Sequence, residues 1–297
     1  MGLNILVTGA GGFVGGGLAR TFAAQGHRVT ALYRKSRPHW DGAVTVQADL
    51  ADPDCRLPDR RFDLVIHAAA HTHLEADLSA EAFVASNVRG TLTLARHLSR
   101  TGAGMVVHLS TLSVYGAIND PVVDSDTPLR DPGLYGTTKL LAEQVLAEQV
   151  AAFPSLSLRL PGVVGPGYYK PWLGRLVNDA CAGRPLSIFN PDGLFNNVID
   201  IDGLAEACVA AAARGRSGAG VCAIGAAMPM TIRDLAALVA ETAGTVPSIV
   251  VGQTAKPSFH ISIEPLRALI GFEPKTTADI VRRYVLARAS EGKGDRI

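Results

Sequence analysis

A tyrosine and a lysine stand four residues apart near the start of an amphipathic segment, LYGTTKLLAEQ at residues 134–144. Because positions i and i+4 share a helical face, Tyr135 and Lys139 would lie side by side. A free tyrosine, with a pKa of about 10, is a poor base at neutral pH, whereas a nearby ammonium favours the phenolate and moves that pKa toward the working range. The pair suits reversible proton transfer at a carbinol or carbonyl oxygen. This spacing arises by chance in roughly one chain in eight, so the surrounding residues must decide whether the pair does chemistry.

Hydroxyl side chains come shortly before the pair, where an apolar segment ends in VVHLSTLSVYG at 106–116. Ser110, Thr111 and Ser113 would stand at the carboxyl end of a buried parallel strand, the edge that faces the ligand crevice in an open α/β sheet. There a serine or threonine hydroxyl could hold a substrate oxygen between itself and Tyr135. We therefore expect the hydroxyls and the Tyr135–Lys139 pair to form one site.

A glycine-rich turn near the N-terminus indicates a second site. In ILVTGAGGFVGGGLAR, Gly9, Gly12 and Gly15 keep a G-x-x-G-x-x-G spacing between a strand and a helix. Small residues let the backbone approach a pyrophosphate, and the helix N-terminus offers free N–H groups and the positive end of its dipole. The tighter G-x-G-x-x-G form is absent because Val14 stands at its last glycine position. A structural turn is the alternative, but the placement favours dinucleotide binding.

The residues after the second expected strand bear on which dinucleotide would bind. An acid there accepts a hydrogen bond from the adenosine ribose of NAD, whereas the 2′-phosphate of NADP needs cations. The stretch ALYRKSR at 31–37 places Arg34 there, with Lys35 and Arg37 close by. A guanidinium can bind phosphate bidentately, so we expect NADP in preference to NAD, unless these charges belong to a solvated turn. After the third expected strand, Asp49 of ADL either contacts the adenine amino group or serves as a cap.

The elements that position these residues alternate over the first 165 residues. Strands are expected at Asn4–Thr8, Arg28–Tyr33, Val44–Gln47, Leu64–Ala68, Met105–Leu109 and Leu156–Leu160. Apolar residues at three- and four-residue spacing predict helices at 13–25, 79–99 and 135–152. Strands without strict alternation, separated by helices, imply a parallel sheet covered on both faces, which is a doubly wound α/β fold of the Rossmann type.

The pattern changes after about residue 165 to loops rich in glycine and proline, with helices expected near 203–214, 231–243 and 276–289. We expect residues 1–165 to form an NAD(P)-binding Rossmann domain and residues 166–297 to form a smaller mixed α/β substrate-binding region. The boundary is approximate, because later segments can return to the Rossmann core. Open α/β sheets place their ligands between such parts, at the carboxyl edge.

Composition limits the kinds of partner. The 297 residues are 47% hydrophobic and 19% charged, and the formal net charge of +1 gives no long-range attraction to nucleic acid or to an anionic membrane. The four cysteines lack a C-x-x-C pair, so we expect a reducing, cytoplasmic setting without disulfides or a thiolate metal site. The first apolar segment is too short for a signal peptide. His67, His71 and His73 have no acidic or thiolate partner at ligand spacing, so we expect loop packing rather than metal binding.

Several segments together resemble one family. They are TGAGGFVG, ADL at 48–50, HAAA at 67–70, NVRGT at 87–91, STLSVYG, YGTTK and RLPGVVGPG at 159–167. In this order and at nearly this spacing they resemble the extended short-chain dehydrogenase/reductases, in the NAD-dependent epimerase/dehydratase group that includes sugar-nucleotide epimerases, dehydratases and 4-ketoreductases. The resemblance covers the first 167 residues well and the remainder only in general layout.

The resemblance implies roles for individual residues. Tyr135 would be the catalytic acid/base, Lys139 its electrostatic partner and Thr111 the catalytic hydroxyl, with Ser110 an adjacent helper. Among the cofactor contacts, two alanines would line the pyrophosphate or ribose, an asparagine would support their loop and a proline would cover the nicotinamide ring. The full set of expected cofactor contacts is Gly9, Gly12, Phe13, Val14, Gly15, Arg34, Asp49, Leu50, Ala68, Ala69, Asn87, Tyr135, Lys139 and Pro161.

The sequence also departs from the family's pattern. Dehydratases of this group resemble STDEVYG, but Leu112 and Ser113 stand at its Asp and Glu, so a sugar dehydratase is not expected. Sugar-nucleotide enzymes resemble R-x-x-N after the sixth strand and place an arginine before an HVDD-like element. Here Gly162 and Asn196 occupy the asparagine and arginine positions, and Gly203 replaces the final acid.

Other groups would then have to bind the polar end of a small-molecule substrate, because a lost bidentate cation weakens a diphosphate site. The candidates for a replacement cation are Arg175, Arg184 and Lys256. The expected substrate contacts are Thr111, Ser113, Tyr135, Gly162 and Asn196.

These observations leave competing functions. The first is an NAD(P)-dependent oxidoreductase or epimerase that transfers a hydride at a secondary alcohol or ketone of a nucleotide sugar or similar polar substrate. An exchangeable NADPH, which Arg34 favours, suits net reduction, whereas a retained NAD suits a redox-neutral sugar-nucleotide 4-epimerase. The second class is a non-catalytic NADP-sensing protein, whose signature would be loss of Tyr135 or Lys139, and both are present. We also expect a homodimer through the helices at 79–99 and 135–152, where small residues such as Ala142 permit close packing.

Overall fold

The computed structural model describes residues 2–38, 40–124, 126–169, 172–215, 217–254 and 257–294. At its centre is a seven-stranded sheet in the order β12-β7-β5-β4-β1-β2-β3, with every neighbouring pair parallel. Because the chain moves from β1 out to β3 and then returns to β4 on the other side of β1, a topological switch point lies at the carboxyl end of β1. The strands are β1 (Asn4–Thr8), β2 (Arg28–Tyr33), β3 (Ala43–Gln47), β4 (Leu64–His67), β5 (Val106–Thr111), β7 (Ser155–Leu160) and β12 (Ala219–Ala223).

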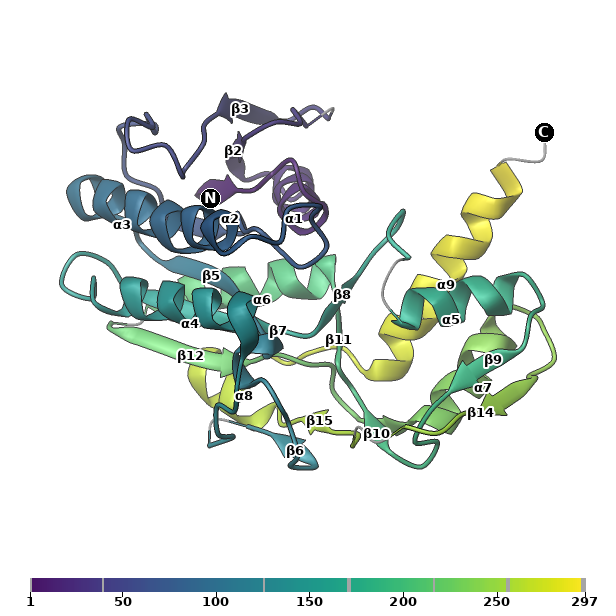
Figure 1. The fold of residues 1–297 in the computed structure, drawn as a ribbon. Helices are drawn as coiled ribbons and strands as arrows, with labels where there is room; N and C mark the ends of the chain where they lie inside the picture. The colour runs from purple at the N-terminus through teal and green to yellow at the C-terminus, as the bar shows by residue number, and fades with distance from the viewer. Residues whose placement is uncertain are drawn as a thin grey trace.

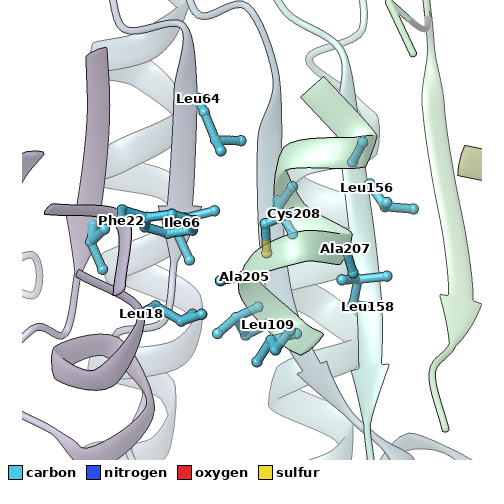
Figure 2. Packing of buried hydrophobic residues seen from close by; sticks show 14 of the residues in the cluster. Leu18, Phe22, Leu64, Ile66, Leu109, Leu156, Leu158, Ala205, Ala207 and Cys208 are labelled. Carbon is cyan, nitrogen blue, oxygen red and sulfur yellow. The ribbon is translucent and has the colours of Figure 1, made fainter. Parts of the chain in front are cut away.

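Helices cover both faces of this sheet (Figure 1). On one face lie α1 (Phe13–Ala24) and α6 (Ile201–Ala213), and on the other lie α3 (Gly90–Thr101) and α4 (Gly133–Ala147). Side chains of β1 alternate between the two layers, because Ile5 and Val7 pack in the cluster of α1 and α6, whereas Leu6 packs in the cluster of α3 and α4. Figure 2 shows the first cluster, in which residues of both helices meet Leu64 and Ile66 of β4. The arrangement confirms the doubly wound α/β fold.

The helix expected at 79–99 is divided into three pieces. A short α2 (Ala80–Phe83) leads into a π-helical turn, η1 (Val84–Arg89), which continues directly as α3. The buried Asn87 lies in the π-helical turn and forms hydrogen bonds to the backbone of His71, far away in the sequence. The spacing of apolar residues does not predict this π-helical turn, because the residue that Asn87 binds is not a neighbour in the sequence. Single π-turns within helices are frequent at functional sites.

The second half of the chain builds a smaller layer with its own core, seen on the right of Figure 1. Its buried apolar residues include Leu176 and Val177 from one helix, Leu235 and Val239 from another, and Val281 from the last. Paired short strands, β8 with β11, β9 with β14 and β10 with β13, connect these helices. The elements are β8 (Gly162–Val164), α5 (Trp172–Cys181), β9 (Leu186–Ile188), β10 (Leu194–Phe195), β11 (Val198–Asp200), β13 (Met230–Thr231), α7 (Ile232–Thr242), β14 (Ile249–Val251) and α9 (Thr277–Gly294).

Some later segments return to the first layer. Both α6 and β12 follow residue 165, yet they pack in or on the central sheet, and α8 (Glu264–Ile270) packs beside them. The remaining elements are a 3₁₀ turn, η2 (Leu112–Tyr115), and the paired strands β6 (Val122–Val123) and β15 (His260–Ile261). Division into 1–165 and 166–297 therefore remains a proposal, supported by the two separate cores. Across the described ranges, no helix is both long and apolar enough to cross a membrane.

Candidate active site

The glycine turn joins β1 to α1 at the switch point. Gly9 has a φ of +70°, in the left-handed region that favours glycine, and a Cβ on it would lie 2.7 Å from the Ala69 nitrogen. A Cβ on Gly15, in the first turn of α1, would lie 2.4 Å from the Gly9 carbonyl oxygen. Gly12 is the N-cap of α1 and has no side chain to occupy the first N–H groups of the helix. The turn, the helix start and the end of β4 thus approach closely and leave helix donors for an anion.

A cavity of about 300 Å³ lies over this turn. Its walls come from the carboxyl ends of β1, β2, β3 and β4, as expected for the adenosine and pyrophosphate end of a dinucleotide. Of the sequence-predicted cofactor residues, those that line it are Gly9, Gly12, Arg34, Asp49, Leu50, Ala68 and Ala69.

The remaining predicted cofactor residues are not among those that line the cavity. Phe13 and Val14 begin α1, and the Phe13 ring stacks on Tyr168 with centroids 4.1 Å apart. Pro161 connects β7 to β8 and is half-buried. Asp49 uses one carboxylate oxygen to accept a hydrogen bond from the Ala51 nitrogen at 3.0 Å, so it caps its own turn while lining the cavity.

Asn87 holds the loop that follows β4. Its side-chain oxygen accepts a hydrogen bond from the His71 nitrogen at 2.7 Å, and its amide group donates to the His71 carbonyl and to the Thr138 hydroxyl, both at 3.0 Å. Because Thr138 is on α4, one buried amide ties the cofactor loop to the helix of the Tyr135–Lys139 pair. This is the loop-supporting placement that the resemblance implies.

Tyr135 lies in the first turn of α4, beside the end of β5. A Cβ on the neighbouring Gly136 would lie 2.3 Å from the Ser113 carbonyl oxygen, so α4 packs tightly on the turn that follows β5. Burial raises the pKa of Tyr135 to about 12, and a hydrogen bond from Thr111 opposes that rise. Thr111 also caps the turn by accepting a hydrogen bond from the Ser113 nitrogen at 3.1 Å. The structure thus brings Tyr135 and Thr111 together.

Lys139 is 1% exposed, and its Nζ lies 2.7 Å from the Nε2 of His108 on β5. Burial lowers the pKa of Lys139 to about 7, opposed by the carboxylate of Glu143 one helical turn further along α4. The expected lowering of the Tyr135 pKa by a neighbouring ammonium is not what the structure shows, because burial dominates the Tyr135 pKa and the lysine amine is directed to His108. The role of Lys139 toward Tyr135 remains a proposal.

Ser110 contacts α4 at Glu143, two helical turns beyond Tyr135. Its hydroxyl donates to the Glu143 carboxylate at 2.5 Å, and Arg159 of β7 binds the same carboxylate through two nitrogens at 3.1 and 2.8 Å. The expectation of a helper hydroxyl beside Thr111 is therefore wrong as to geometry, because the Ser110 hydroxyl is engaged by Glu143. No local pattern marks Glu143, Arg159 or His108, and only i+4 spacing from Lys139 hints at the first.

The histidines near the end of β4 have separate surroundings. His67 is buried between threonines, His71 forms a hydrogen bond to the Asp77 carbonyl, and the His73 ring packs edge-on against Tyr135 with centroids 5.7 Å apart. Within the described residues, no group of three or more His, Cys, Asp or Glu side chains is placed to bind a metal. Ligand spacing alone predicted that His73 serves in loop packing, whereas the structure places its imidazole against Tyr135.

Asn196 is not placed for substrate contact. Its amide donates to the carbonyls of Ala226 and Ile261, each at 2.8 Å, and its oxygen accepts from the Ile261 nitrogen at 2.7 Å. The residue is 1% exposed, and both of its amide hydrogens and its oxygen bind segments that are distant in sequence. The prediction of Asn196 as a substrate residue is therefore wrong. Gly162, by contrast, is exposed at the start of β8.

The cations expected to replace the missing diphosphate-binding arginine differ in whether other side chains already bind them. Arg184 binds Asp179 at 2.7 Å, which occupies its guanidinium. Arg175 is exposed on α5, and no ion pair involves it among the described side chains. Lys256 lies outside the described residues. Of the two arginines, both within the described residues, Arg175 is the one without a recorded ion pair.

A parallel sheet with a glycine turn at its switch point, a cavity over that turn, and a half-buried tyrosine that lies beside a threonine and shares a helix with a buried lysine define the class of nicotinamide-dependent short-chain dehydrogenase/reductases. The NAD dependent epimerase/dehydratase family model matches residues 5–225, and the chain belongs to this family. Membership confirms the family and the enzyme class expected from the motifs.

Relatives share parts of the chain to different extents. A dTDP-4-dehydrorhamnose reductase from Mycolicibacterium smegmatis is 37% identical over 160 residues, which cover 52% of this chain but 44% of that protein. A UDP-glucose 4-epimerase from Azospirillum brasilense is 28% identical over 304 residues, covering 92% of this chain and 87% of that protein. The solved structure of MoeE5 in complex with UDP-glucose and NAD superimposes with a TM-score of 0.79 at 24% identity, covering 98% of this chain and 99% of that one. This last likeness confirms the fold.

Burial of Lys139 predicts a specific pH dependence of stability. Its folded-state pKa of about 7 lies below the ordinary value of 10.5. At neutral pH the lysine is fully protonated in the unfolded chain, so burying it on folding costs stability. The resulting loss of stability is complete below the folded pKa and disappears as the pH rises through the unfolded value. The difference in free energy of unfolding, Lys139→Met minus wild type, should therefore be more positive at about pH 7 than at about pH 9.5, because the variant lacks the penalty of the buried lysine. Urea denaturation at both pH values measures this difference, and a pH-independent difference would contradict it.

Proposed function

We propose that this chain transfers a hydride between a nicotinamide cofactor and a secondary alcohol or ketone of a nucleotide sugar or similarly polar molecule. One observation carries the proposal: Tyr135, at the start of the helix that also buries Lys139, lies beside Thr111 at the carboxyl end of β5. The names of the reductase and epimerase relatives support carbinol or carbonyl chemistry on nucleotide sugars.

The chain's own residues supply proton transfer and orientation. With its pKa raised to about 12, Tyr135 stays protonated at neutral pH and is an acid for the oxygen of a ketone. Thr111 would hold that oxygen beside the phenol, and the His73 ring against Tyr135 would limit access of water. A bound nicotinamide supplies or accepts the hydride. In the reverse direction, the phenolate formed after proton donation takes the proton back from an alcohol.

Net reduction and epimerisation use the same groups, and the cofactor decides between them. Arg34 and Lys35 line the cavity at the end of β2, and in the described part of the chain neither forms an ion pair. Two cations at this position favour a 2′-phosphate, so we propose NADP and net reduction. A redox-neutral 4-epimerase with retained NAD is the second candidate, because the epimerase relative matches most of both chains. Presence of both Tyr135 and Lys139 in a buried site speaks against a non-catalytic NADP sensor.

Free thiols at Cys55, Cys181 and Cys208 support the reducing, cytoplasmic location expected from the sequence. We keep that location as a proposal.

Tyr135→Phe should abolish turnover of carbonyl and nucleotide-sugar substrates while leaving NADPH affinity within a few-fold of wild type, because it removes the transferable proton and keeps the ring. Stopped assays of NADPH oxidation and fluorescence titration of NADPH measure the two quantities. Tyr115→Phe is the matched control, since the Tyr115 hydroxyl donates to the Asp124 carbonyl at 3.2 Å. Turnover by Tyr135→Phe close to that of the control would show that another group moves the proton.

Arg34→Asp should weaken NADPH binding at least tenfold and leave NADH binding unchanged or tighter, because a carboxylate repels the 2′-phosphate and accepts from a ribose hydroxyl. Arg37→Ser, three residues further on and outside the cavity wall, is the control and should change neither affinity by more than a few-fold. Calorimetric titration of both cofactors measures the effect. Equal losses for both cofactors, or stoichiometric NAD released from the purified wild type by denaturation, would refute the NADP assignment.

We propose that the chain forms a homodimer through η1 and α4. The exposed apolar side chains there are Val84, 42% exposed, Leu134, 42% exposed, and Leu141, 47% exposed. Ala142 is fully buried within one chain, so the expectation that it permits close packing between chains is wrong. Leu141→Glu should convert the dimer to monomer in analytical ultracentrifugation, whereas Leu286→Glu, on α9, should not. A wild type that sediments as a monomer at micromolar concentration would contradict the proposal.

A further inference from the structure

His108 lies in the centre of the sheet, on β5, directly beneath α4. It is fully buried, and its Nε2 is 2.7 Å from the Nζ of Lys139. Among the described residues, His108 is the recorded hydrogen-bond partner of this lysine. The contact thus links Lys139, a residue of the proposed proton-transfer site, to His108, which belongs to no sequence motif.

The second nitrogen of His108 lies beside a hydroxyl that can accept its proton. Its Nδ1 lies 3.3 Å from the Ser157 hydroxyl oxygen on β7. Burial, with the neighbouring Lys139 as a smaller cause, holds the pKa of His108 well below its usual value, so the ring is neutral. A neutral ring that donates from Nδ1 to Ser157 presents an unprotonated Nε2, and an unprotonated nitrogen can accept from the lysine amine.

A second buried imidazole holds the ring of His108 in place. His67 stacks on it with centroids 5.5 Å apart and an interplanar angle of 29°. Thr91 donates to the Asn87 carbonyl at 2.6 Å, so its oxygen accepts from the Nε2 of His67 at 2.9 Å. The Nδ1 of His67 is then unprotonated and accepts from the Thr8 hydroxyl at 2.9 Å.

The stack also reaches the glycine turn. The Thr8 oxygen accepts from the Ala69 nitrogen at 3.1 Å, and Thr8 immediately precedes Gly9. Hydrogen bonds and one ring stack therefore connect the cofactor cavity through His67 and His108 to Lys139.

The acidic neighbour of Lys139 is engaged elsewhere. Glu143 raises the Lys139 pKa from a distance, but its oxygens accept from Ser110 and from both nitrogens of Arg159. From the elements packed around the lysine, the titratable groups are thus His67 on β4, His108 on β5, Glu143 on α4 and, through Glu143, Arg159 on β7. Of these, His108 is the one in hydrogen-bond contact with Nζ.

We propose that His108 is a positioning residue, whose unprotonated Nε2 anchors the Lys139 amine and thereby sets both the place of that amine and the pH at which it is protonated. The inference rests on the proposed function for its catalytic consequence, but the anchoring itself is a property of the folded chain. Without the anchor, a four-carbon side chain would be free to choose other rotamers, and the ammonium form would lose its acceptor.

Three substitutions separate anchoring from packing. His108→Gln can place an amide oxygen near the position of Nε2, His108→Asn reaches only the position of Nδ1, and His108→Phe keeps a ring without an acceptor. If His108 anchors Lys139, His108→Gln preserves the protonation midpoint of the lysine, whereas His108→Asn and His108→Phe change it. If His108 only fills space, Phe is tolerated best.

The lysine can be followed directly, because the chain contains few lysines and Lys139→Met assigns its signal. NMR titration of protein labelled with ¹⁵N and ¹³C in lysine reports the protonation midpoint of Lys139 without any substrate. We expect Asn and Phe at position 108 to lower this midpoint by about one pH unit, since loss of an acceptor disfavours the ammonium, and Gln to leave it near that of wild type. In the assay of NADPH oxidation, Asn and Phe should lower kcat at least tenfold and shift its pH profile, with rescue by Gln.

The outcomes distinguish failure of the anchor from failure of the proposed function. An unchanged Lys139 midpoint in both His108→Asn and His108→Phe would overturn the positioning role, whatever the activity. Absence of turnover in wild type, together with the expected midpoint shifts, would overturn the proposed function and leave the anchor standing. ¹⁵N spectra of the histidines provide a further test, because a His108 ring protonated on Nε2 would also overturn the assignment.

Discussion

Burial of one lysine amine between α4 and β5 is the constraint on which the rest of the site depends. An unpaired ammonium in an apolar interior is costly, so the surrounding groups have to accept from it or offset its charge. His108 accepts from Nζ at 2.7 Å, and Glu143 contributes a carboxylate one turn away that Arg159 holds in place. These contacts fix α4 against the sheet. Tyr135, one turn before the lysine on the same helix, is thereby placed beside Thr111 at the carboxyl end of β5.

The cofactor end and the proton-transfer end of the site share this polar core. His67 stacks on His108 and bonds to Thr8, which leads into the glycine turn, while Asn87 ties the loop after β4 to Thr138 of α4. Both ends therefore depend on hydrogen bonds among β1, β4, β5 and α4 rather than on apolar packing alone. Such buried polar networks specify one arrangement when all their members are satisfied. The family's chemistry requires that kind of fixed geometry, because proton and hydride must move at the same carbinol.

Features that depend on local pattern could be predicted from the sequence. The expected strands lie within two residues of β1, β2, β3, β4, β5 and β7, because short apolar segments and turn residues are local signals, and the glycine turn and Tyr135–Lys139 spacing are likewise local. Features that depend on partners distant in the sequence could not be predicted in this way. Asn196 was expected at the substrate but is held by Ile261, and Ser110 was expected beside Tyr135 but is held by Glu143. His108 stands in an apolar segment without any motif, and only its contact with Lys139 identifies it.

The most direct test of the central claim follows the hydride itself. NADPH carrying deuterium at the transferred C4 position would be incubated with the protein and a nucleotide-sugar ketone, and the product would be examined by mass spectrometry and NMR. We expect one deuterium on the new carbinol carbon, with the hydroxyl proton drawn from solvent through Tyr135. Consumption of the ketone without deuterium at that carbon, or binding of both ligands without any transfer, would contradict it.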